Sequence, residues 1–101
     1  MPKISINHKC NLPASDAFSK IKTFFETDQD IRRLDPKMKC EFIENKLTGK
    51  ATGNQFKADI SVTSQEAGSI VSIIVDLPLL LTPIKGKVQE TIQKKLNKYL
   101  S

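Results

Sequence analysis

The chain is poor in the residue types that most often build metal sites, disulfide frameworks and aromatic platforms. It contains no tryptophan, one tyrosine, one histidine and two cysteines in 101 residues. Two cysteines cannot build a disulfide framework, and a structural zinc site needs about four ligands in closely spaced pairs. His8, Cys10 and Cys40 do not have this spacing, so we expect no metal and no cofactor.

Long apolar runs are also missing. The longest apolar stretch, residues 70–81, contains two polar residues and a proline, and it is shorter than the roughly 18 residues that a membrane span requires. The N-terminal residues lack the apolar core of a signal peptide. We therefore expect a cytoplasmic protein without a membrane span, and the length fits a single domain over residues 1–101.

Positive charge is concentrated in the two terminal segments. The formal net charge is +5, and residues 1–24 and 77–101 together carry nine of the sixteen basic residues but two of the eleven acidic ones. Such charge keeps small domains in solution and weakly favours anionic partners. Specific nucleic-acid binding is not expected, because phosphate-loop and helix-turn-helix motifs are missing and the aromatics Phe42 and Phe56 fall on the inward phase.

Five segments have the period of two that is typical of half-buried strands. They are residues 3–10, 38–43, 47–51, 56–63 and 69–77. Short polar turns join the last four, so these are expected to pair in sequence, and the first strand is expected to pair with the last.

Two segments have apolar residues at helical spacing. Residues 14–25 predict one helix, with Ser15 or Asn11 as its cap. Thr82 is the predicted N-cap of a second helix, with Pro83 in its first turn. The apolar stripe of this second helix is Ile84, Val88, Ile92, Leu96, Tyr99 and Leu100.

The order β-α-β-β-β-β-α predicts a two-layer α+β domain, in which both helices cover one face of an antiparallel sheet. The arrangement is similar to a small version of the helix-grip fold. Small inward residues, Gly49, Ala51 and Ala58, either let the C-terminal helix approach the sheet closely or leave a cavity beneath it.

No group of residues predicts catalysis. His8 and Cys10 share a strand face, but Cys10 is expected to be a buried core residue and His8 a half-buried histidine at the edge of the sheet. The polar segment 27–36, anchored by Ile31 and Leu34, is expected to be an extra turn or the frayed end of the first helix, with its carboxylates in a solvated loop. These carboxylates are Asp28, Asp30 and Asp35.

The positive signals for function are apolar. Ile70 and Ile74 fall on the outward phase of the last strand, and Ile43 falls on the outward phase of an earlier one. Leu79, Leu80 and Leu81 exceed what the start of a helix requires. Clustered exposed apolar residues mark interaction surfaces, whereas the alternative is that part of the leucine run only covers the end of the core. If the residues are exposed, we expect an apolar polymer surface or ligand to contact the leucines and a homodimer to form through the sheet.

The two ends of the chain resemble a known family. The residues that carry the resemblance are Met1-Pro2-Lys3-Ile4-Ser5-Ile6, Leu12-Pro13, Asp16-Ala17, Leu80-Leu81, Pro83, Lys85-Gly86, Val88, Ile92 and Leu96. They are similar to those of the polyhydroxyalkanoic acid system family, small bacterial proteins of polyhydroxyalkanoate granule regions. The resemblance implies a storage-polymer setting and no catalytic residue.

These observations favour a non-enzymatic binding module for an apolar surface such as a polyhydroxyalkanoate granule. The alternative is a carrier of small hydrophobic ligands, with a cavity under the C-terminal helix. A third class, an enzyme acting on a hydrophobic acyl substrate, lacks a nucleophile and base pair in the sequence. A cavity of several hundred cubic ångströms would favour the carrier, and a filled core would favour the binding module.

Overall fold

The computed structural model describes residues 3–54 and 56–100. Five strands form one antiparallel sheet in the order β1-β5-β4-β3-β2. The strands are β1 (Lys3–Cys10), β2 (Lys39–Ile43), β3 (Thr48–Thr52), β4 (Lys57–Gln65) and β5 (Gly68–Asp76). The helices are α1 (Ala14–Thr27), α2 (Gln29–Leu34) and α3 (Lys85–Tyr99), with short 3-10 helices η1 (Glu44–Lys46) and η2 (Leu79–Ile84).

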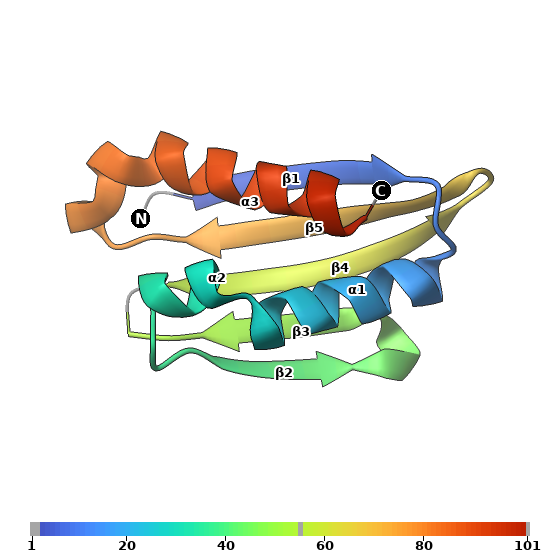
Figure 1. Cartoon of the computed structure of the whole chain (residues 1–101), viewed down its shortest axis with the longest axis horizontal. Coiled ribbons are helices and arrows are strands. Elements are labelled where there is room, and N and C mark those ends of the chain that lie inside the picture. The colour runs from blue at the N-terminus through green and yellow to red at the C-terminus, as the bar shows by residue number, and fades with distance from the viewer. Residues whose placement is uncertain (1–2, 55, 101) are drawn as a thin grey trace.

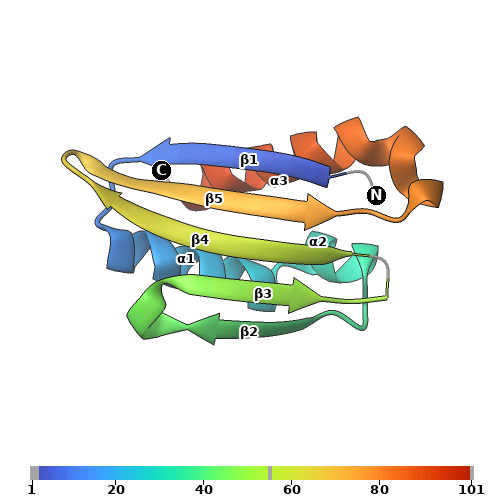
Figure 2. The same ribbon diagram turned by 180° about the vertical axis from the view of Figure 1, so that it is seen from behind.

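The three α-helices lie on one face of the sheet. In Figure 1, α3 runs over β1 and β5, while α1 and α2 lie over β4 and β3. Figure 2 shows the opposite face of the sheet without a covering helix. The predicted two-layer α+β fold is therefore confirmed, and so is the pairing of the first strand with the last, since Ile6 lies opposite Ile73.

The core lies between the two layers and follows the predicted periodicities. Ile4 and Ile6 alternate with exposed residues on β1, and the same alternation buries three apolar residues of β5. The apolar stripe of α1 faces them, which brings Phe24 to full burial. The buried partners from β5, α1 and α3 are Val71, Ile73, Val75, Ala17, Phe18, Ile21, Phe25, Val88, Ile92, Leu96 and Leu100.

The polar segment after α1 forms a short helix of its own, which agrees with the extra turn that was one of the two expectations. The alternative of a frayed end was wrong, and so was the solvated setting expected for Asp28 and Asp35. The backbone N–H groups of Asp30 and Ile31 donate to Asp28 Oδ1 at 3.0 and 3.2 Å, which caps α2 and separates it from α1. Asp28 and Asp35 are buried, with 5% and 1% of their surface exposed. The predicted anchor Ile31 is buried, whereas the side chain of Leu34 lies outside the described part of the chain.

Asp35 joins the end of α2 to the turn between β3 and β4. Its Oδ2 accepts a hydrogen bond from the Phe56 backbone N–H at 3.3 Å. A Cβ on Gly53 would overlap this carboxylate, so the turn requires glycine there. The aspartate therefore fixes the end of α2 to the turn between β3 and β4.

Helix α1 begins at Ala14 as predicted, but the predicted caps of both helices and the predicted start of the second were wrong. Helix α1 has Pro13 at its N-cap position and no side-chain cap from Ser15 or Asn11. Helix α3 begins at Lys85, and the Thr82 hydroxyl donates to the Leu79 carbonyl at 2.8 Å instead of capping α3. The reason is the 3-10 helix η2, which uses Thr82 and Pro83 before α3 starts.

Candidate functional site

An apolar projection extends from the end of the molecule where β5 leaves the sheet. Leu79, Leu80 and Ile84 of η2 are 73%, 90% and 38% exposed, and we call these three residues the leucine tip. Leu77, just before η2, is 1% exposed and belongs to the core. The chain therefore passes from core to solvent within two residues.

The local geometry explains why these leucines do not enter the core. Pro78 is extended (φ −62°, ψ 152°) and the Leu81 N–H donates to its carbonyl at 2.9 Å, which starts the 3-10 turn. Three residues per turn point successive side chains about 120° apart. Of the three leucines predicted to contact a surface, Leu79 and Leu80 are exposed, whereas Leu81 is half-buried. Ile84, predicted in the apolar stripe of α3, points outward instead.

The outward isoleucines lie on the uncovered face of the sheet, as predicted. Ile43 is 50% exposed, Ile74 is 43% exposed and Ile70 is half-buried. Ile43 and Ile74 line a shallow depression of about 510 Å³, with Lys50 and Asp59 between them. Because β3 and β4 separate β2 from β5, the three isoleucines do not form one continuous apolar patch.

The space under α3 is small. A cavity of about 30 Å³ is lined by apolar side chains, including Ala51, Ala58, Val88 and Ile92. Pockets that enclose small-molecule ligands usually measure about 300–1,000 Å³, so this cavity has room for about one or two water molecules. Gly49 leaves no space, because the Phe42 ring covers it.

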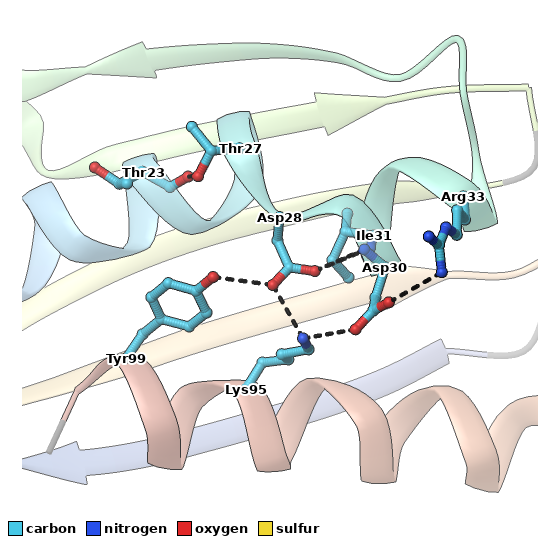
Figure 3. A network of polar contacts seen from close by, with 8 residues as sticks. All are labelled: Thr23, Thr27, Asp28, Asp30, Ile31, Arg33, Lys95 and Tyr99. Atoms are coloured by element: carbon cyan, nitrogen blue, oxygen red, sulfur yellow. Dashed lines mark hydrogen bonds and ion pairs between the residues drawn. The ribbon is translucent and has the colours of Figure 1, made fainter.

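A polar network holds the C-terminal end of α3 against α2 (Figure 3). Asp28 Oδ2 accepts from the Tyr99 hydroxyl at 3.0 Å and pairs with Lys95 Nζ at 3.1 Å. Lys95 Nζ also pairs with Asp30 Oδ2 at 2.7 Å. The Tyr99 ring packs on Phe24, with ring centroids 5.2 Å apart. Sequence reasoning missed this network, although the position of Asp28 three residues before Ile31 is typical of an N-cap.

The network shifts the pKa values of its members. Burial by itself raises the pKa of Asp28, but hydrogen bonds from Lys95, the Ile31 N–H and Tyr99 outweigh it, and the pKa lies below its usual value. Hydrogen bonds to Asp30 and Asp28 raise the pKa of Lys95. The hydrogen bond to Asp28 raises the pKa of Tyr99. The geometry is that of a structural clamp between α2 and α3.

His8 and Cys10, which were considered for nucleophilic or metal chemistry, share one face of β1 but have different hydrogen-bond partners. His8 Nδ1 is 3.2 Å from Gln93 Nε2, and Cys10 Sγ is 3.2 Å from Ser69 Oγ. Burial lowers the pKa of His8 and raises the pKa of the Cys40 thiol. Across residues 3–54 and 56–100, no group of three or more His, Cys, Asp or Glu side chains is placed to hold a metal ion.

Comparison with known protein families identifies the family of this chain. The model of the family described as "Putative polyhydroxyalkanoic acid system protein" matches residues 4–100. The chain belongs to this family. No curated protein sequence matches it significantly. In this family member, the residues 80–86 that carry the sequence resemblance form the end of η2 and the start of α3, while Met1 and Pro2 lie outside the described residues.

Solved structures share the fold of this polyhydroxyalkanoic acid system family member at low sequence identity. TTHA0849 from Thermus thermophilus has a TM-score of 0.61 and 11% identity, with 98% of this chain and 94% of that chain covered. Protein CV1439 from Chromobacterium violaceum has a TM-score of 0.54 and 9% identity, with coverage of 99% and 95%. Ara h 8.0201 has a TM-score of 0.53 and 12% identity, with coverage of 98% and 97%. These likenesses support the helix-grip arrangement.

No helix within the described residues is long and apolar enough to cross a membrane.

Proposed function

We propose that this family member is a non-enzymatic binding module that docks on the apolar surface of a polyhydroxyalkanoate granule through the leucine tip. The observation that carries the proposal is the exposure of Leu79 and Leu80, at 73% and 90%, beside the fully buried Leu77. Membership of the polyhydroxyalkanoic acid system family supports the choice of polymer.

The energetics of the tip suit surface attachment. Burying an apolar side chain of leucine size contributes roughly 1.5–3 kcal/mol. The tip is already ordered in the free protein, because hydrogen bonds from the Leu81 N–H and the Thr82 hydroxyl close its turn. Binding therefore loses little conformational entropy in the backbone, which favours affinity.

The size of the internal cavity favours this proposal over the ligand carrier. About 30 Å³ of apolar space under α3 is far below the volume of a typical ligand pocket. The free cysteines, Cys10 and Cys40, fit action in the reducing cytoplasm, where such granules would be met.

A double substitution, Leu79→Ser with Leu80→Ser, tests the proposal. We expect binding to purified polyhydroxybutyrate granules in a sedimentation assay to weaken at least tenfold, with the thermal midpoint nearly unchanged. The matched control is Ile43→Ser with Ile74→Ser, which removes two exposed apolar side chains from the sheet face. Undiminished binding by a folded tip variant would refute the granule-docking role.

The sheet face is a second candidate surface, for a second copy of this chain. Ile43 and Ile74 stand on opposite sides of the depression of about 510 Å³, and Lys50 and Asp59 between them offer charges of both signs to a two-fold partner. Light scattering on the protein and on the Ile43→Lys, Ile74→Lys variant tests this. A dimer that becomes a folded monomer supports the surface, and a monomeric parent protein rejects it.

A further inference from the structure

Lysines of two elements lie next to the two ends of the segment that carries the leucine tip. At the end of the sheet next to η2, five residues lie opposite one another on neighbouring strands. In order across the sheet they are Lys39, Thr52, Lys57, Asp76 and Lys3. Its one acidic member, Asp76, pairs with Lys3 Nζ at 3.8 Å. Lys57 is exposed and lines a hollow of about 150 Å³ together with Leu77 and Pro78, so it lies beside the residue from which η2 starts.

The second element is the first turn of α3. Lys85 and Lys87 follow the tip directly along the chain. Lys87 is exposed and Lys85 is half-buried. Salt bridges along the described chain occupy Lys3, Lys22, Arg33, Lys94 and Lys95. Lys57, Lys85 and Lys87 are in none of those pairs. Lys57 therefore lies before the leucine tip, beside Pro78, and Lys85 and Lys87 follow it, all three outside those salt bridges.

The opposite end of the sheet differs. Its connections carry charges of both signs, with Glu44 and Lys46 in η1 and Glu66 between β4 and β5. Glu44 is paired with Lys22 at 3.3 Å. At the end that carries the leucine tip, the acidic residues Asp35 and Asp76 each have a partner, Phe56 N–H and Lys3. Lys57, Lys85 and Lys87 therefore form a basic rim there, which the net charge of the chain alone does not reveal.

We infer that the surface that receives the leucine tip bears anionic phospholipid headgroups, and that Lys57, Lys85 and Lys87 face those headgroups while Leu79 and Leu80 insert among the acyl chains. This inference rests on the proposed function, because it names the chemistry of the surface to which the tip docks. Apolar side chains ringed by lysines match an interface in which an oily layer underlies negative charge. The long lysine stem keeps the ammonium at headgroup level while the leucines enter the layer. A bare polyester surface would engage the leucines and leave the lysines without partners.

Vesicles of phosphatidylglycerol mixed with phosphatidylcholine, compared with vesicles of pure phosphatidylcholine, test the inference. We expect at least tenfold tighter binding to the anionic vesicles at low salt, with the difference shrinking as salt is raised. The variant Lys57→Gln, Lys85→Gln, Lys87→Gln should lose about fivefold in affinity per lysine removed. The matched control is Lys9→Gln, Lys20→Gln, Lys46→Gln, which removes the same charge away from the tip.

The possible results distinguish the inference from the proposed function. Equal binding to both kinds of vesicle, or equal losses in the two lysine variants, would overturn the inference. Binding of both lysine variants to lipid-free polyester particles, with no binding of the parent protein to vesicles, would also overturn it and leave granule docking intact. Loss of vesicle binding in the rim variant and in the Leu79→Ser, Leu80→Ser variant, with retention in the matched control, supports it.

Discussion

The two ends of α3 are held in different ways. At the C-terminal end, Leu96 and Leu100 are buried, and Lys95 and Tyr99 reach the buried carboxylate of Asp28. At the N-terminal end, α3 has no side-chain cap and follows directly on the exposed leucine tip. Helix α3 thus has one end anchored by the polar network, and its other end follows the η2 turn that presents apolar side chains to solvent.

The residues that stabilise the fold are therefore different from those that are free to contact a binding surface. The anchored end carries the residues whose removal disturbs the core or leaves polar groups without partners. The tip contributes little to the core, because most of its apolar surface stays exposed. Substitutions at the tip can therefore test binding without unfolding the protein.

Identical truncations at the two ends give the largest contrast. Leu96→Ala removes a side chain that is fully buried and should lower the free energy of unfolding by about 2–5 kcal/mol. Leu80→Ala, at 90% exposure, should change it by less than about 0.5 kcal/mol. Urea denaturation measures both. Similar losses in the two variants would mean that the tip belongs to the core.

Removal of the Asp28 carboxylate breaks the clamp itself. Asp28→Ala should cost about 2–3 kcal/mol, because α2 loses its cap and the Tyr99 hydroxyl loses its buried partner. Asp30→Ala is the control in the same network. The side chain of Asp30 is 53% exposed, and its ion pair should be worth less than about 1 kcal/mol. A larger loss for Asp30 than for Asp28 would contradict the assignment of the clamp.

The clamp also predicts a smaller, pH-dependent effect. Asp28 has a lowered pKa in the folded protein, so its contribution to stability is complete above its unfolded pKa of about 4 and is lost as pH falls through the folded value. Lys95 and Tyr99 have raised pKa values. Their contributions are complete below about pH 10 and are lost as pH rises through the folded values.

Urea midpoints measured across this pH range check the effect. Asp28→Asn keeps one acceptor oxygen, which can still cap α2, but its amide nitrogen cannot accept from Tyr99 and the charge is lost. The loss of stability toward acid pH should therefore be less steep in this variant than in the parent protein. If the urea midpoints of the two proteins fall equally as the pH is lowered, carboxylates other than Asp28 control acid unfolding.

The smallest predicted effect is at the free end of α3. A Cβ at Gly86 would meet no atom within 4 Å, and Gly86 lies in the first turn of the helix. Gly86→Ala should therefore raise the free energy of unfolding by about 0.5–1 kcal/mol, since alanine restricts the unfolded chain and favours the helix. A thermal melt measures the gain. No gain would indicate that this turn is frayed and that the contrast between the two ends is larger still.

Periodicity was sufficient to predict the sheet, its strand order and the stripe of α3, because each depends on patterns within one segment or on short turns. The start of α3 was missed for a local reason. A threonine before a proline is compatible both with an N-cap and with a 3-10 turn, and the extended Pro78 decides between them. The exposure of Leu79 and Leu80 was predictable, because the run contains more leucines than the start of a helix requires. The exposure of Ile84 was not, because its helical spacing placed it in the apolar stripe of α3.

The clamp could not be predicted, because its partners are distant in sequence. Tyr99 lies 71 positions from Asp28, and no local pattern relates them. The burial of Asp35 has the same origin, since its partner Phe56 lies across the turn between β3 and β4. Charged residues in a polar segment look solvated until the fold places another element over them.

The pairing of β1 with β5 decides where a reporter group can be attached. Lys3 lies opposite Asp76, so the first described residues are at the same end of the molecule as η2, while Leu100 is at the other end of α3 (Figure 1). The 15 residues of α3 span roughly 22 Å. A fluorescent protein or affinity tag joined before β1 would stand beside the leucine tip and compete with a granule or vesicle for access to it. The same tag joined after Leu100 leaves the tip clear, so a loss of binding seen only with the N-terminal fusion would report on the tag.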